Sequence, residues 1–213
     1  MKKLLKKELR KNEFRVAIFG SSRINRKDVN YKEIYKLGKM LGERDIDIVT
    51  GGGPGLMMAA SFGHKIGSKK TGAHAIALNI KLPMEQKFNK YSDVRKEFTH
   101  FTKRLDNFML LSNAVVVAPG GVGTLLEFLY TWQLVQVEHV CPIPIILLGK
   151  MWPDLIKWLR NYPLKNKYFA PKDLQLIFLA NDSEKTIKII DKAHREFLEG
   201  GKNFCLNQKK YKI

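Results

Sequence analysis

Apolar runs and helically spaced apolar positions alternate along the 213-residue chain. Short apolar runs, several of them rich in β-branched residues, predict strands at 14–19, 46–50, 73–80, 114–118, 143–148 and 174–179. Apolar positions three or four residues apart, such as Ile34, Leu37 and Leu41, predict a helix after the first strand. The later helices are expected at 54–66, 102–111, 123–137, 152–160 and 183–198. Residues 81–97 are polar with few regular signals, so we expect no regular element there.

This alternation of strands and helices predicts an α/β fold in a single domain. Several strands are apolar throughout, which is typical of a parallel sheet that is covered by helices on both faces. We place the domain at residues 14–200, after a basic N-terminal extension at 1–13 and before a basic C-terminal tail at 201–213. Pro54 is expected in the first turn of its helix, and Ser183 is a candidate N-cap.

Two glycine-rich loops follow predicted strands, at Thr50–Gly55 and Pro119–Thr124. Such a turn lets the backbone approach a phosphate and points free amides and the helix dipole at it. Ligands bind at the carboxyl ends of parallel strands, so we expect the site at the two loops, on neighbouring strand ends. Neither loop has the Walker A or the Gly-x-Gly-x-x-Gly pattern, so ATP hydrolysis and NAD chemistry are not supported. The alternative is a pair of tight turns without a ligand.

Glu127 is the candidate reactive group. It lies three residues after Thr124, in the expected first turn of a largely apolar helix that we expect to be buried. A buried carboxylate needs a partner or a function, and Arg104 on the preceding helix is the candidate cation to face it or to hold a phosphate. The alternatives are a carboxylate that only stabilises a helix N-terminus and, for the arginine, a surface ion pair with Asp106 or Glu97.

A resemblance rests on both loops in this order, Gly51-Gly-Gly-Pro-Gly-Leu-Met57 and Pro119-Gly-Gly-Val-Gly-Thr-Leu-Leu-Glu127, with Arg104 between them. Over residues 14–160 the chain resembles the Lonely Guy family of nucleotide phosphoribohydrolases. The resemblance implies a Rossmann-like, doubly wound parallel sheet and a homodimer with sites near the subunit interface. It also implies hydrolysis of the N-glycosidic bond of a nucleoside 5′-monophosphate, such as AMP or a cytokinin riboside monophosphate, with no metal and no organic cofactor.

The resemblance assigns roles by position. Arg104 and Glu127 match the catalytic pair, and Glu85 matches a substrate-binding residue. The Glu127 carboxylate would stabilise positive charge on the ribose and activate water, while Arg104 would hold the phosphate or ribose end and keep Glu127 ionised. The other substrate-binding candidates belong to the two loops and to the turn after the first strand: Gly20, Ser21, Gly51, Gly52, Gly53, Gly120, Gly121, Val122, Gly123 and Thr124.

Three positions depart from the family pattern. Many relatives have polar residues where this chain has Leu105, Leu126 and Met58. These replacements motivate a second hypothesis, a sensor or carrier that binds a mononucleotide without turnover. Amino-acid decarboxylation is not supported, because no lysine lies in a recognisable cofactor-binding context.

Charge and cysteine content bear on partners and location. Half of the net charge of +18 lies in residues 1–15 and in the tail from Lys202. We interpret these ends as solvated segments, with RNA binding through them as a less favoured third hypothesis. Cys141 and Cys205 are far apart, so we expect no disulfide, no zinc site and a reduced compartment. No signal-peptide core or membrane-spanning run is evident, so we expect a cytoplasmic protein without membrane association.

Overall fold

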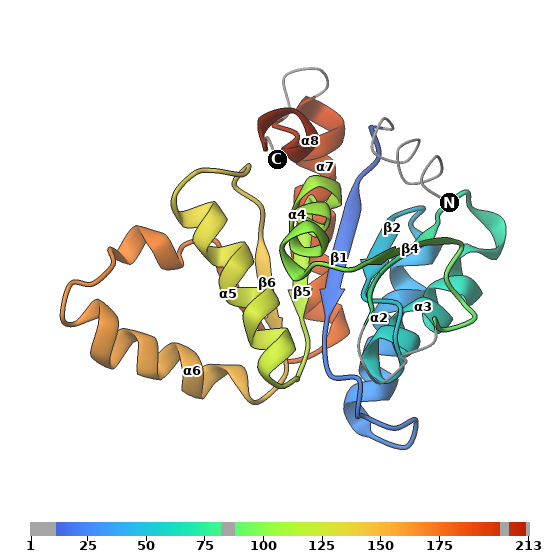
Figure 1. Cartoon of the computed structure of the whole chain (residues 1–213), viewed down its shortest axis with the longest axis horizontal. Coiled ribbons are helices and arrows are strands. Elements are labelled where there is room, and N and C mark those ends of the chain that lie inside the picture. The colour runs from blue at the N-terminus through green and yellow to red at the C-terminus, as the bar shows by residue number, and fades with distance from the viewer. Residues whose placement is uncertain (1–11, 82–87, 201–204, 212–213) are drawn as a thin grey trace.

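The structure, a computed structural model, describes residues 12–81, 88–200 and 205–211. Its centre is a seven-stranded sheet in the order β4-β3-β2-β1-β5-β6-β7, in which every neighbouring pair is parallel (Figure 1). The strands are β1 (Arg15–Phe19), β2 (Asp47–Thr50), β3 (Ala75–Ile80), β4 (Val94–Phe98), β5 (Ala114–Val117), β6 (Ile145–Leu148) and β7 (Ile177–Ala180). The predicted α/β fold with a doubly wound parallel sheet is confirmed.

Strand β4 lies where we expected no regular element, and that prediction was wrong. Only its two ends, Val94 and Phe98, are buried, while the three residues between them are partly or fully exposed. An edge strand of this kind lacks the continuous apolar run that marks a central parallel strand.

Helices cover both faces of the sheet, and the strands supply alternate side chains to each face. Helices α4 (Phe101–Leu111), α5 (Val122–Gln136) and α6 (Trp152–Leu159) share one core with Ala17 and Phe19 of β1. Helices α2 (Val29–Glu43), α3 (Leu56–Gly67) and α7 (Ser183–Gly200) share the other core with Val16 and Ile18. Figure 1 shows α4 and α5 on the viewer's side of the strands. In the described ranges, no helix has the length and hydropathy needed to cross a membrane.

Three details of the helices differ from the prediction. Helix α3 begins at Leu56, after Gly55, so Pro54 lies outside it. The amide of Lys185 donates to Oδ1 of Asp182 over 2.7 Å, so Asp182 and not Ser183 caps α7. Helix α5 was expected to be buried, but one side of it is exposed, with exposed fractions of 85% at Val122, 44% at Leu126 and 48% at Leu129.

The C-terminal segment packs against the domain. Cys205 forms a disulfide with Cys141, which corrects our expectation of unpaired cysteines. Asn207, at the start of the short helix α8 (Asn207–Lys210), is buried and donates through Nδ2 to the carbonyls of Met109 and Ser112. Tyr211 is buried as well. Asn207 and Tyr211 are therefore not solvated as we expected of this tail, because their side chains bond to α4 and the residue after it, while Lys209 and Lys210 are exposed.

Candidate active site

The two glycine loops flank the central strand. They follow β2 and β5, which are not adjacent as we expected, because β1 lies between them. The turn Gly20–Arg23 follows β1 and fills the space between the loops: the amide of Ser21 donates to the carbonyl of Pro119 over 3.0 Å, and the amide of Leu56 donates to the carbonyl of Ser21 over 2.9 Å. From β1 the strands follow in chain order toward one edge of the sheet as far as β4, and from β5 to β7 they follow toward the other edge. Open α/β sheets bind ligands at such a switch point.

A cavity of about 560 Å³ opens at this edge of the sheet, the lower edge in Figure 1. Nine of the predicted site residues line it: Gly20, Ser21, Gly51, Arg104, Gly121, Val122, Gly123, Thr124 and Glu127. Six further residues that we did not predict also line it: Ser22, Arg23, Met57, Asn79, Ile80 and Phe101. Glu85 lies outside the described residues.

Arg104 and Glu127 form a buried ion pair in this cavity. Nη1 of Arg104 donates to Oε1 of Glu127 over 2.9 Å, and Nε donates to the carbonyl of Leu78 over 2.7 Å. The guanidinium also lies 4.9 Å from the ring centroid of Phe108. These contacts rule out the alternative of a surface ion pair with Asp106 or Glu97. The arginine is held from three sides and fixes the position of the carboxylate.

The first glycine loop makes room for this arginine. A Cβ at Gly51 would lie 2.6 Å from Sδ of Met57 and 2.7 Å from Nη2 of Arg104, so any larger residue requires one or both side chains to shift. The next two glycines do not line the cavity: the carbonyls of Gly52 and Gly53 accept hydrogen bonds from the amide and the side chain of Asn89. Of the three predicted glycines of this loop, Gly51 therefore lines the cavity, whereas Gly52 and Gly53 do not.

The second glycine loop leaves open space where a ligand could lie. A Cβ at Gly121 or Gly123 would meet no atom within 4 Å, so steric crowding does not explain either glycine. Gly120 differs, since a Cβ there would come within 2.1 Å of Oγ1 of Thr124, and it does not line the cavity. The loop leads directly into α5, whose first amides lack helical partners and can bind an anion.

Burial controls the protonation of Glu127. The carboxylate lies in the second turn of α5 and not in the first turn as we expected, because Glu127 is the sixth residue of a helix that begins at Val122. Burial raises the pKa of Glu127 above its ordinary value, and the charge and hydrogen bond of Arg104 oppose this rise without cancelling it. Arg104 thus favours the ionised carboxylate, as the resemblance implies, while burial opposes it. A carboxyl group with a raised pKa is suited to proton transfer.

Two of the six lining residues that we did not predict have features in the sequence that could have indicated a place in the site. Phe101 lies three residues before Arg104, which is helical spacing on one face, and its side chain is 50% exposed although it is a large aromatic. Arg23 directly follows Gly20, Ser21 and Ser22 in the turn after the first strand. Nothing in the local pattern of Met57, Asn79 or Ile80 separates them from core residues.

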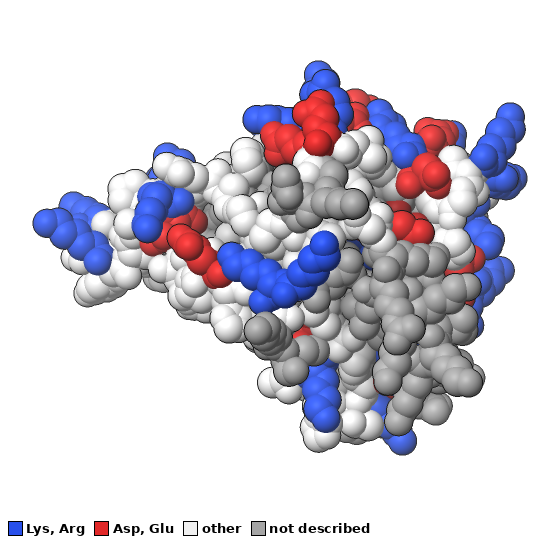
Figure 2. Space-filling view, turned by 90° about the horizontal axis from the view of Figure 1, so that it is seen from above, with Lys and Arg blue, Asp and Glu red and all other residues white. Residues whose placement is uncertain are grey.

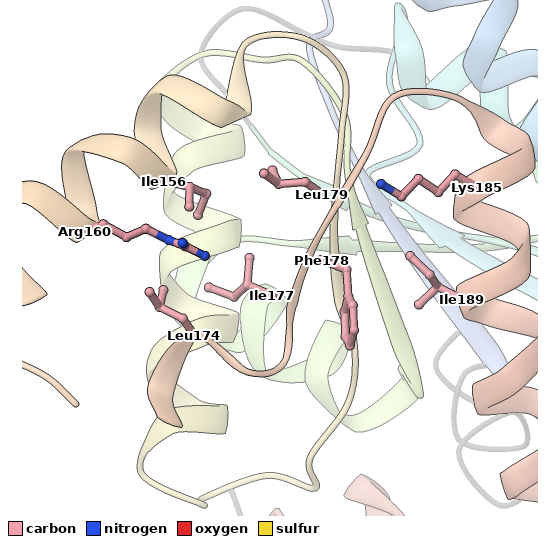
Figure 3. A pocket seen from close by; sticks show the side chains of 8 residues that line it. All are labelled: Ile156, Arg160, Leu174, Ile177, Phe178, Leu179, Lys185 and Ile189. Atoms are coloured by element: carbon pink, nitrogen blue, oxygen red, sulfur yellow. The ribbon is translucent and has the colours of Figure 1, made fainter. Parts of the chain in front are cut away.

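A second cavity, of about 460 Å³, lies at β7 on the edge of the sheet (Figure 3). Figure 3 shows Ile177 and Leu179 pointing toward α6, and Phe178 on the opposite side of the strand. Arg160 and Lys185 are its charged lining residues, and no carboxylate is among the described residues that line it. Without a base to activate water, this cavity does not compete with the one at β1 as an active site.

The fold and the cavity define a Rossmann-like α/β protein with a glycine-rich loop at a helix N-terminus and a buried carboxylate at the switch point of its sheet. The model of the family described as possible lysine decarboxylase matches residues 57–190, more than half of the chain, and the chain belongs to this family.

The chain is similar to several known proteins. A pyrimidine/purine nucleotide 5′-monophosphate nucleosidase of Escherichia coli is 29% identical over 147 residues, which cover 63% of this chain and 30% of the relative. A cytokinin riboside 5′-monophosphate phosphoribohydrolase of Arabidopsis thaliana is 26% identical over 190 residues, or 87% of this chain and 84% of the relative. These relatives confirm the predicted family resemblance.

A solved structure supports the fold. The molybdenum cofactor binding protein of Rippkaea orientalis superposes with a TM-score of 0.63 at 19% identity, over 84% of this chain and 96% of that protein. At this identity the similarity concerns the fold alone.

Proposed function

We propose that this protein hydrolyses the N-glycosidic bond of a nucleoside 5′-monophosphate, AMP or an N6-modified AMP, to the free base and ribose 5-phosphate. The observation that carries the proposal is the Arg104–Glu127 pair, buried in the same cavity as the open glycine loop at the start of α5. The named activities of the relatives from Escherichia coli and Arabidopsis thaliana support a nucleotide glycosidase.

The polarity of the cavity supports one orientation of the substrate. The amides of Gly121 and Gly123 and the hydroxyl of Thr124 lie at the β1–β5 side and suit a phosphate. Ile80 and Phe101 lie at the β3 side and suit an apolar, stackable base. The ribose would then lie between them, near Glu127.

The reaction follows from this orientation. As the bond from C1′ to the base nitrogen breaks, the bonding electron pair leaves with the base, and positive charge builds on the ribose. The Glu127 carboxylate stabilises this charge and takes a proton from the water whose oxygen attacks C1′. The departing base takes up one proton from solvent, and Glu127 afterwards returns one to solvent, so that the carboxylate is regenerated. Arg104 fixes the carboxylate through Nη1 and is itself fixed by the carbonyl of Leu78. Burial excludes water from the pair, and these electrostatic effects are stronger in the resulting low dielectric.

The sensor or carrier hypothesis loses its motivation in this geometry. Leu105 is buried in α4, Leu126 is exposed on α5, and Met58 packs against the core on the other face of the sheet. None of the three is among the described residues that line the cavity. The departures from the family pattern therefore leave the described cavity unchanged.

RNA binding finds no support on the face seen from above. Figure 2 shows Lys and Arg interspersed with Asp and Glu there, so the described part of that face forms no continuous basic surface. If RNA does bind, deleting residues 1–13 and the tail from Lys202 should abolish its retention at moderate salt.

A homodimer is part of the proposal. The exposed apolar side chains of Val122, Leu126 and Leu129 follow one another at helical spacing on α5, starting from Val122 at the cavity, and a second copy of the chain would remove them from water. Light scattering coupled to size exclusion should give twice the chain mass, and Leu126→Glu together with Leu129→Glu should give the monomer.

The proposed reaction is tested by incubating the purified chain with a panel of nucleoside 5′-monophosphates and the matching nucleosides, and separating the products by chromatography. We expect free base from one or more monophosphates and far less from the nucleosides. No base release from any monophosphate by a folded protein would contradict the proposal.

A further inference from the structure

The turn between the two glycine loops presents a cation to the cavity. Arg23 lines the cavity beside Ser21 and Ser22, on the β1 side that adjoins the loop Gly121–Thr124. Its side chain is exposed, and among the described residues its guanidinium has no recorded hydrogen bond or ion pair. A guanidinium that is free at the rim of an anion-binding loop is available to an incoming ligand.

The other cation of the cavity is already engaged. Arg104 donates to Glu127 and to the carbonyl of Leu78, so its charge is largely balanced within the protein. The loop Gly121–Thr124 offers amides and a hydroxyl but no full charge. A phosphate on that loop, with close to two negative charges, therefore needs a further cation, and Arg23 is the one that remains among the described lining residues.

The structure also holds the backbone of this turn firmly. Oγ of Ser21 accepts a hydrogen bond from the amide of Arg23 over 3.1 Å, and backbone hydrogen bonds join Ser21 to Pro119 and to Leu56. Gly55 packs directly under the turn: its φ is 66°, and a Cβ there would lie 2.3 Å from the carbonyl oxygen of Ser21. The first glycine loop thus packs the turn against the second loop, and the backbone of Arg23 is held in place.

We propose that Arg23 binds the 5′-phosphate of the substrate, opposite Gly121–Thr124, and makes the site select nucleotides over nucleosides. This inference rests on the proposed function, because it assumes that a nucleotide occupies the cavity. A planar guanidinium can form two hydrogen bonds to one phosphate, a geometry that a lysine ammonium does not reproduce.

The test is calorimetric titration of the full chain, carrying Glu127→Gln throughout so that AMP is not consumed, with AMP, ribose 5-phosphate and adenosine. We expect Arg23→Ala to lower the affinity for AMP and for ribose 5-phosphate by about tenfold or more, which is the loss typical of a charge-assisted hydrogen bond. The affinity for adenosine should change by less than about twofold. Arg23→Lys should recover part of the loss. Lys27→Ala, which removes the same charge from an exposed position four residues later that does not line the cavity, is the matched control and should bind like Glu127→Gln alone.

The outcomes distinguish a failure of the phosphate-binding role of Arg23 from a failure of the proposed hydrolysis. If the wild type binds AMP but releases no base, the proposed hydrolysis fails and the comparison of Arg23 variants still stands. Arg23→Ala binding AMP like Glu127→Gln alone, or losing AMP and adenosine equally, would overturn the role of Arg23. A wild-type protein that binds neither AMP nor ribose 5-phosphate would overturn it too. Melting curves check that each variant is folded, and where hydrolysis occurs, Arg23→Ala should raise KM with little change in kcat.

Discussion

The guanidinium of Arg104 passes so close to Gly51 that Nη2 would lie 2.7 Å from a Cβ at that position. One glycine of the first loop therefore leaves the room that the arginine holding Glu127 occupies. The first loop acts on the site in two ways: through this contact, and through the packing of Gly55 against the Ser21 turn. The second loop leaves space for the ligand.

Substituting Gly51 should damage the reaction more than the fold. In Gly51→Ala the new Cβ pushes against both the guanidinium of Arg104 and Sδ of Met57, and a displacement of about 1 Å in a group that positions the reaction can lower the rate about a hundredfold. Steady-state kinetics should show a fall in kcat of this order with a small change in melting temperature. Gly72→Ala is the control, because a Cβ there would meet only Oδ1 of Asp45, at 3.8 Å. Equal effects of the two substitutions on kcat would refute the positioning role of Gly51.

The rate should depend on the protonation of Glu127. Its pKa is raised by burial, and the base form is the one that accepts a proton, so kcat/KM should fall as the pH drops through a value above about 4.3, the ordinary pKa of glutamate. Removing the opposing charge in Arg104→Gln should move this acid limb to still higher pH. A pH–rate profile measures both, and an acid limb at or below the ordinary value, or one that shifts downward in the variant, would count against the assignment.

Phe101 should contribute to binding of the base. Its exposed ring lines the cavity on the same face of α4 as Arg104, and stacking on a nucleic-acid base is worth about 1–3 kcal/mol when removed by alanine. Phe101→Ala should raise KM for AMP by about fivefold or more, whereas Phe101→Trp should stay near the wild type. Binding of ribose 5-phosphate, which has no base, should be the same in all three proteins. A parallel loss of ribose 5-phosphate binding would instead indicate a structural defect.

The disulfide should stabilise the fold. It joins residues 64 apart in the sequence, and a closed loop of that length is worth about 2–4 kcal/mol in the free energy of unfolding. Denaturant unfolding of the oxidised wild type should show this difference from Cys205→Ser. Adding a reductant should lower the free energy of unfolding of the wild type to that of the variant and leave the value for the variant unchanged. A wild type whose free energy of unfolding does not change on reduction would contradict the prediction.

The bond also bears on location. Disulfides persist mainly in oxidising compartments, so the cytoplasmic location that we expected from the sequence stays a prediction, and the bond does not support it. Labelling of free thiols in protein taken directly from cells would show whether Cys141 and Cys205 are bonded there.

The pairing of Arg104 with Glu127 was predictable because both belong to motifs with a known order in the family. The position of the loops was not, since local patterns do not reveal that β1 lies between β2 and β5. The packing of Asn207 and Tyr211 was hidden as well, because a few buried residues in a basic segment give no periodic signal. The division of the chain after residues 13 and 200 stays a prediction, and the docking of residues 205–211 shows that the second boundary does not separate independent parts.

The most direct test of the central claim is base release from AMP by the wild type and by Glu127→Gln, each first shown by calorimetry to bind AMP. The amide keeps the size of the carboxylate and a hydrogen-bonding oxygen, but it cannot accept a proton from water or balance the charge on the ribose. We predict that the wild type yields adenine and ribose 5-phosphate in equal amounts, and that Glu127→Gln binds AMP but is slower by about a hundredfold or more. Equal rates in the two proteins would contradict the account.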